Sequence, residues 1–135
     1  MRSVVHARPV PFASPPEIST TADRATAVHA ADVDGDGDLD ALSASLDNSK
    51  IAWYENVGGE GTSWVIHTIS TSAAGAVSVY SADLDGDGDL DALSASIVDD
   101  KIAWYENMGG AGTSWTLHTI TTDALTATSV YAGDV

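Results

Sequence analysis

Short stretches of alternating apolar and polar residues recur along the chain, separated by clusters of Gly, Asp, Asn and Ser. Such alternation is typical of β-strands, because successive side chains point to opposite faces of a sheet. In the second half of the chain it predicts four strands, over Val77–Ala82, Ala92–Ser96, Lys101–Glu106 and Trp115–Ile120. No stretch has a sustained helical period, so the pattern predicts an all-β fold.

The same pattern returns with a period of 51 residues. Lys50–Asn56 is identical to Lys101–Asn107, and Asp32, Asp83 and Asp134 follow one another at this spacing. Repeats of about 40–50 residues with four short strands each are typical of β-propellers. We therefore predict a β-propeller fragment, in which each repeat forms one four-stranded antiparallel blade.

This register divides the chain into an irregular N-terminal segment or leftover strand (1–26), a first blade (27–76), a second blade (77–127) and the start of a third (128–135). The third repeat stops inside its motif, and two blades cannot close a propeller. Stacked repeats normally need about three units for stability. We therefore expect either a piece of a larger ring or a chain that self-associates to complete one.

A nine-residue acidic loop follows the first strand of each repeat, with an aspartate at every second position. The candidate metal ligands are Asp32, Asp34, Asp36, Asp38 and Asp40 in the first loop, and Asp83, Asp85, Asp87, Asp89 and Asp91 in the second. Carboxylates at this density repel one another unless a cation lies among them. The sequence therefore predicts about one Ca²⁺ for each complete repeat.

Within each loop the expected roles differ from position to position. Alternate side chains point the same way in a curled loop, so those of Asp32, Asp34, Asp36 and Asp40 are expected to converge, as are those of Asp83, Asp85, Asp87 and Asp91. Asp38 and Asp89 are expected to offer their backbone carbonyls. Leu39 and Leu90 are expected to turn inward as apolar anchors.

Three other interpretations of the loops are weaker. An EF-hand needs a Glu at position 12 and flanking helices, whereas this position holds Ser43 or Ser94 between strands. A metal-free Asp-Gly turn does not explain two copies with complete spacing. Magnesium is disfavoured because a crowded carboxylate cage leaves little room for the waters that it retains.

The pattern Asp-x-Asp-x-Asp-Gly-x-x-Asp, set between strands of such a repeat, resembles the FG-GAP/VCBS repeat family over about residues 27–135. This family includes the calcium-loop blades of integrin α-subunit propellers. The resemblance implies a β-propeller with the loop between the first and second strand of each blade, and nothing catalytic. The family's Phe-Gly…Gly-Ala-Pro pair is replaced by Ala30-Ala31-Asp32 and Ser81-Ala82-Asp83. The chain is thus closer to the VCBS or FG-GAP-like branch, and integrin-type ligand binding is not implied.

The composition excludes some classes of binding partner. The formal net charge is −15, which two bound divalent cations would change to −11. This acidity argues against nucleic acid and anionic membranes, which bind basic patches. The chain has no cysteine, and neither a membrane-spanning run nor a signal peptide is visible.

The motif Trp-Tyr-Glu-Asn, at residues 53–56 and 104–107, allows two interpretations. An aromatic ring beside an acid and an amide is a common way to bind a sugar. The alternation favours the other interpretation, in which the Trp packs between blades and the Asn begins the next turn. His67 and His118, one in each repeat, are expected to be structural strand positions.

We therefore expect a non-enzymatic, calcium-stabilised repeat module of an extracellular or surface protein, which serves protein or glycan interaction or adhesion. No catalytic triad or phosphate-binding loop is visible. The alternatives are a calcium-dependent lectin that uses the Trp-Tyr-Glu-Asn strands, and an accessory region of a secreted polysaccharide-degrading enzyme.

Overall fold

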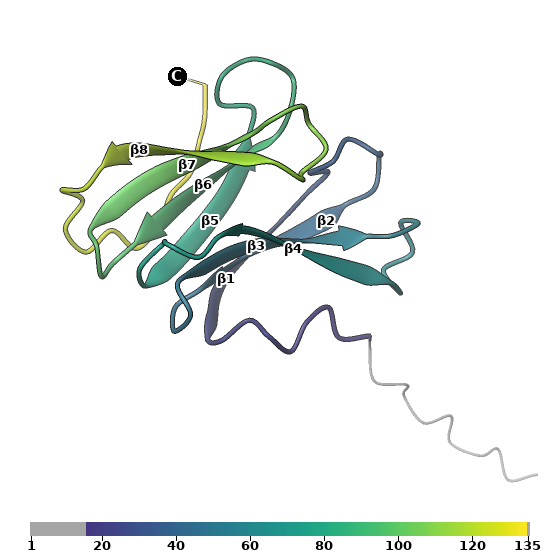
Figure 1. Cartoon of the computed structure of the whole chain (residues 1–135), viewed down its shortest axis with the longest axis horizontal. Helices are drawn as coiled ribbons and strands as arrows, with labels where there is room; N and C mark the ends of the chain where they lie inside the picture. Colours follow the sequence, from purple (N-terminus) through teal and green to yellow (C-terminus); the bar gives the residue numbers. More distant parts are fainter. Residues whose placement is uncertain (1–15, 135) are drawn as a thin grey trace, which may run out of the picture.

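The computed structural model describes residues 16–134 of the chain and shows two four-stranded antiparallel sheets in that range (Figure 1). Blade 1 consists of β1 (Ala25–Ala31), β2 (Asp40–Ser45), β3 (Lys50–Asn56) and β4 (Trp64–Ser70), and blade 2 of β5 (Ala76–Ala82), β6 (Asp91–Ser96), β7 (Lys101–Asn107) and β8 (Trp115–Thr121). Each sheet has its strands in chain order. The predicted all-β class is confirmed. The first and last residues of the four predicted strands each agree to within one residue with those of β5 to β8. Of the predicted N-terminal segment 1–26, residues 1–15 lie outside the described residues, and Ala25 and Thr26 already belong to β1.

The two blades share one strand register. Leu42 lies opposite Trp53 in blade 1, and Leu93 lies opposite Trp104 in blade 2, one period later. The β2–β3 and β6–β7 turns repeat as well, since Ser49 and Asp100 both have a left-handed backbone, with φ of 55° and 50°. Nearly identical sequences thus produce nearly identical blades.

The core lies between the blades, where β5 packs against β1 and β2. Much of this core is alanine, including Ala44, Ala76 and Ala92, which are all fully buried. Small side chains let two sheets approach closely, and the larger Trp53 and Tyr105 fill the remaining space. We call this contact the blade interface.

In the described residues, three hydrogen bonds join a side chain of one blade directly to a carbonyl of the other across the blade interface. The Thr26 hydroxyl donates to the Ala76 carbonyl at 2.9 Å, and the Trp53 indole N–H donates to the Gly112 carbonyl at 2.8 Å. The third runs from blade 2 to blade 1, and it links the side-chain amide of Asn107 to the carbonyl of Val33 at 3.0 Å. Buried polar groups that find partners across an interface fix its register as well as its stability.

Residues 127–134 continue the repeat pattern on the other side of β5. The Tyr131 ring lies 4.7 Å from that of Tyr80, which itself lies 4.5 Å from the ring of His29. These three rings are one period apart in sequence. The backbone N–H of Val130 also donates to the Ser78 hydroxyl at 3.1 Å. This segment therefore lies against β5 much as β5 lies against β1.

Candidate metal centres

The two aspartate loops connect the first strand of each blade to the second, at the place that the resemblance implies. Each loop reverses its path through two glycines with positive φ, which are Gly35 (+76°) and Gly37 (+95°) in the first loop. Residues that have a Cβ atom are strained at positive φ, so glycine suits both positions. The tight path brings aspartates that are far apart along the loop to one point.

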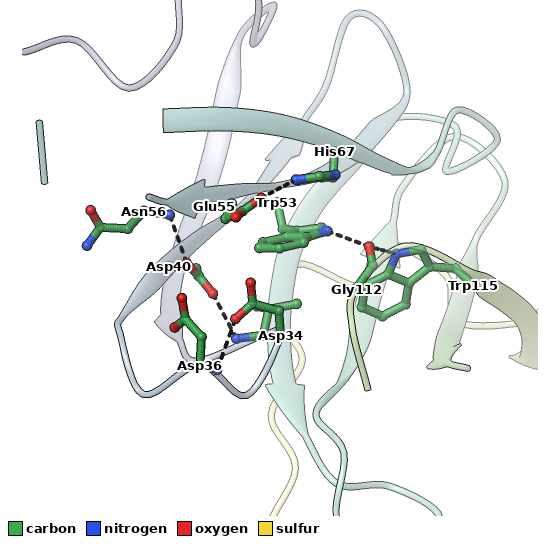
Figure 2. A network of polar contacts seen from close by, with 10 residues as sticks. Asp34, Asp36, Asp40, Trp53, Glu55, Asn56, His67, Gly112 and Trp115 are labelled. Carbon is green, nitrogen blue, oxygen red and sulfur yellow. Dashed lines mark hydrogen bonds and ion pairs between the residues drawn. The ribbon is translucent and has the colours of Figure 1, made fainter. Parts of the chain in front are cut away.

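Three carboxylates converge in each loop. Oxygens of Asp32, Asp34 and Asp40 all lie within 4.8 Å of one another, and so do oxygens of Asp83, Asp85 and Asp91. We call these groups triad 1 and triad 2. Figure 2 shows Asp34, Asp36 and Asp40 of the first loop facing one another. Six of the ten predicted ligands thus meet in two places.

The other four predicted ligands lie outside the triads. Asp36 accepts the backbone N–H of Asp38 at 2.8 Å, and Asp87 does the same for Asp89 at 2.9 Å. The Asp38 side chain turns toward Gly59, where a Cβ would overlap its carboxyl group. A metal ligand role for the Asp38 side chain therefore finds no support, whereas its predicted carbonyl role stays a prediction.

Asp40 anchors the first loop to its blade. Its side chain is 2% exposed, and its two oxygens accept the backbone N–H groups of Val33 and Asn56, both at 2.9 Å. Asp91 is held in the same way by the N–H groups of Leu84 and Asn107. Each carboxylate therefore ties the start of its loop to the end of the third strand, and it positions the triad.

The triads carry uncompensated negative charge. Burial raises the pKa of Asp34 and of Asp40 above the ordinary value, and neighbouring carboxylates raise each pKa further. For Asp34 these neighbours are Asp40, Asp36 and Glu55. The pKa values of Asp85 and Asp91 are raised for the same reasons. A cation would relieve both the repulsion and the cost of burying charge.

Triad 1 also contains an oxygen that a cation would satisfy. Oδ2 of Asp32 accepts the N–H of Gly37 at 3.0 Å, whereas its Oδ1 is buried and has no hydrogen-bond partner among the described residues. Buried polar atoms are rarely left without partners. The donor set is made of carboxylate oxygens alone, which suits a hard cation such as Ca²⁺. The residues present therefore fit a calcium ion.

Leu39 is not an apolar anchor, and that prediction is wrong. Its side chain is 63% exposed, although the equivalent Leu90 is partly buried and packs against the core. The reason is that Leu90 faces the blade interface, near Val33 of blade 1. Leu39 has no described blade on its own side, so the neighbouring blade rather than the loop creates the anchor.

A histidine–glutamate pair lies beside each loop. Nε2 of His67 is 2.9 Å from Oε2 of Glu55, and the corresponding distance from His118 to Glu106 is 2.7 Å. His67 stacks on the Trp53 ring at 4.3 Å, which agrees with its predicted structural role (Figure 2). The pairing itself was not predicted, and its signal is the 12-residue spacing between Glu and His in both repeats.

Trp53 packs between the blades, as the alternation favours. It is 1% exposed, and its indole N–H reaches Gly112 of blade 2, which also accepts the indole N–H of Trp115 (Figure 2). The interpretation of Trp53 as a stacking platform for a sugar is therefore wrong. Trp104 is partly exposed and stacks on His118 at 4.3 Å.

Two blades with an aspartate loop after each first strand define a propeller-type repeat protein. The model of the FG-GAP-like repeat family matches residues 32–94, from the start of the first loop to the middle of β6. This match confirms the predicted resemblance, and the matched segment is an FG-GAP-like repeat. A search of curated proteins and a search of solved structures found no match. Among residues 16–134 no helix is suited to cross a membrane.

Proposed function

We propose that the chain is a calcium-binding repeat module in which each loop holds one Ca²⁺ in a structural role. The observation that carries this proposal is the convergence of two equivalent carboxylate triads, one of which contains the buried and unpartnered Oδ1 of Asp32. Asp32, Asp34 and Asp40 would hold the first ion, and Asp83, Asp85 and Asp91 the second. The bound ion supplies positive charge that neutralises the loop.

The way in which the triads are tied into the blades supports a structural role for the ion. Asp40 and Asp91 each connect the loop to the third strand through two backbone hydrogen bonds. An ion that binds the folded triad but not the unfolded chain stabilises the blade. The loops lack the bidentate Glu of tight sites, so we expect affinities of roughly 10⁻⁴–10⁻³ M or somewhat tighter, as in extracellular modules.

Thermal and chemical unfolding in calcium and in chelator test this proposal. At a free calcium concentration 100 times the dissociation constant, each site should add about 2.7 kcal/mol to the free energy of unfolding. Asp34→Ala combined with Asp85→Ala should remove the calcium-dependent part. Asp123→Asn, a change at an exposed carboxylate outside both loops, is the control. Equal stability of the unmodified chain in calcium and in chelator would contradict the proposal.

We further propose that the module acts outside the cell or at its surface, in interaction or adhesion rather than catalysis. The FG-GAP-like match and the weak expected calcium affinity support this, because millimolar free calcium is an extracellular condition. Secretion of the chain fused to a reporter, followed by binding to cell-surface proteins and glycans in calcium, tests it. Turnover of a polysaccharide by the purified chain would overturn the non-catalytic assignment.

We also propose that a second copy of this chain can bind blade 1. A groove of about 310 Å³ lies between blade 1 and the segment that precedes it, and its lining includes Ala25, Ala41 and Tyr54 of the blade and Ile18 and Ala22 of the segment. The equivalent residues of blade 2 are Ala76, Ala92 and Tyr105, which blade 1 covers at the blade interface. The groove is therefore the surface that a blade of this repeat fits. In the incoming copy, residues 127–134 lie against β5 and must move aside.

Two glycines in one turn provide the test of this association. Gly61 is the equivalent of Gly112, where a Cβ would overlap the Trp53 ring of the neighbouring blade. A Cβ at Gly61 meets only Trp64 at 4.0 Å, so Gly61→Ala should block a second copy without a steric clash inside its own blade, although it strains the backbone at a φ of +70°. Gly58→Ala is the control, since Gly58 has a similar φ of +78° and open space around it. Sedimentation should show association that Gly61→Ala removes and Gly58→Ala keeps. A monomer at all concentrations would contradict the proposal.

A further inference from the structure

Val33 connects triad 1 to the second blade through its backbone. Its N–H donates to Oδ2 of Asp40 at 2.9 Å, and its carbonyl accepts the side-chain amide of Asn107 at 3.0 Å. The Val33 side chain is 2% exposed and lies in the core between the blades. The peptide groups on both sides of Val33 are therefore fixed, one by the triad and one by blade 2.

Asn107 is fully buried and uses its side chain for three contacts. Its Oδ1 accepts the N–H of Gly112 at 2.9 Å, while its amide nitrogen donates to Val33 and to Leu90 at 3.1 Å. The contact with Leu90 supports the loop of its own blade. The contact with Val33 supports the loop of the other blade, so one side chain holds both loops.

The equivalent residue in blade 1 is Asn56, and among residues 16–134 its side chain forms hydrogen bonds only within its own blade. Its amide donates to the Leu39 carbonyl at 3.0 Å, and its Oδ1 accepts the N–H of Gly61 at 2.8 Å. Among residues 16–134 no hydrogen bond reaches the carbonyl of Leu84, which is the counterpart of Val33. Within the described part of the chain, the first loop is thus held from two blades and the second loop from one.

The triads also differ in their surroundings. Asp32 and Asp34 are half-buried, whereas Asp83 and Asp85 are exposed. Oδ1 of Asp83 accepts the N–H of Gly86 at 2.7 Å, while the equivalent oxygen of Asp32 has no partner. Less solvent around the charges strengthens their attraction to a cation, and a loop fixed in advance loses less entropy on binding.

We propose that Asn107 is a positioning residue for the calcium site of the other blade, so that the two loops bind Ca²⁺ with unequal affinity, the first more tightly. This inference rests on the calcium-binding function proposed above. Residues outside the ligand set that orient it commonly change metal affinity by about 10- to 100-fold. We therefore expect a difference of about ten-fold between two loops of nearly identical sequence.

Calcium titration by calorimetry on single-loop variants tests this inference. Asp85→Ala leaves the first loop and Asp34→Ala leaves the second, so each dissociation constant is measured alone. The first should be lower by about ten-fold. Equal constants would overturn the inference, whereas absence of calcium binding in the unmodified chain would overturn the proposed function instead.

Asn107→Ala and Asn56→Ala form a matched pair for the cross-blade contact. In the Asp85→Ala background, Asn107→Ala should weaken binding to the first loop by about ten-fold, although Asn107 lies in blade 2. In the Asp34→Ala background, Asn56→Ala should leave the second loop unchanged. An unchanged first loop in the Asn107→Ala protein would contradict the inference. If that variant does not fold, the two dissociation constants of the single-loop variants decide, and equal constants would contradict the inference.

Discussion

The two blades differ in burial much more than in sequence. Trp53 and Trp104 lie in identical seven-residue strands, and each stacks on a histidine at 4.3 Å. Trp53 is nevertheless 1% exposed, while Trp104 is partly exposed. The difference arises because blade 2 covers the Trp53 side of blade 1. In a repeat protein, therefore, the neighbouring repeat decides which residues belong to the core.

The largest expected consequence concerns the two tryptophans themselves. Trp53→Ala removes a buried ring and its hydrogen bond to Gly112, so it should lower the free energy of unfolding by about 3–5 kcal/mol. Trp104→Ala removes an equivalent ring that is partly in solvent, and it should cost less than half as much. Urea unfolding of both variants in calcium measures the difference. Equal losses would show that burial within the blade, rather than the blade interface, stabilises these residues.

A smaller difference is expected at two glycines of the β3–β4 and β7–β8 turns. Gly112→Ala and Gly61→Ala face the same backbone strain, since φ is +65° and +70°. Only at Gly112 would the added Cβ overlap the Trp53 ring, so this variant should lose about 1–3 kcal/mol more than Gly61→Ala. Thermal unfolding at low protein concentration, where copies do not associate, provides the comparison. A larger loss for Gly61→Ala would contradict this packing of the interface.

Local pattern was enough to predict what lies within a single blade. Alternation gave the strands of blade 2 to within one residue, and the period placed each acidic loop between the first two strands. The convergence of Asp32, Asp34 and Asp40 follows from their spacing and from the glycines between them. Each of these features depends on residues close together in the sequence, where strand period and turn chemistry are sufficient.

Which copy of a repeated residue contacts the other blade could not be predicted in the same way. Leu39 and Leu90 have the same neighbours in sequence, yet only Leu90 has a blade beside it. The cross-blade contact of Asn107 with Val33 joins residues 74 positions apart, and nothing local distinguishes Asn107 from Asn56. Repetition shows that two positions are equivalent in sequence, but the packing of whole sheets makes them unequal in structure.

The same two leucines provide a third, smaller comparison. Leu90→Ser should lower the free energy of unfolding by about 1 kcal/mol, because it exposes part of the core between the blades. Leu39→Ser should change it by less than about 0.5 kcal/mol, since surface substitutions away from special contacts are nearly neutral. Chemical unfolding with chelator present separates this effect from calcium binding. If Leu39→Ser lowered the free energy of unfolding as much as Leu90→Ser, Leu39 would act as an anchor within its own loop after all.

The smallest expected effect is the dependence of stability on pH, which should differ between the two triads. The pKa values of Asp34, Asp40, Asp85 and Asp91 are raised in the folded state above 3.8, chiefly by burial. At a pH between 3.8 and the raised values the folded state therefore binds more protons than the unfolded state. The calcium-free protein should then become more stable as the pH falls toward 4. In calcium the trend should reverse, because protons compete with the ion for the carboxylates.

Unfolding in chelator between pH 7 and pH 4 measures this trend for each loop. Asp34→Asn should reduce the dependence of the free energy of unfolding on pH more than Asp85→Asn does, because Asp34 is the less solvated of the two side chains. Glu55 raises the pKa of Asp34 and Glu106 raises the pKa of Asp85 in the same way, so the expected difference comes from solvation. Equal reductions by the two substitutions would mean that the charges of the two loops are equally solvated, and the electrostatic part of the difference between the blades would then be lost.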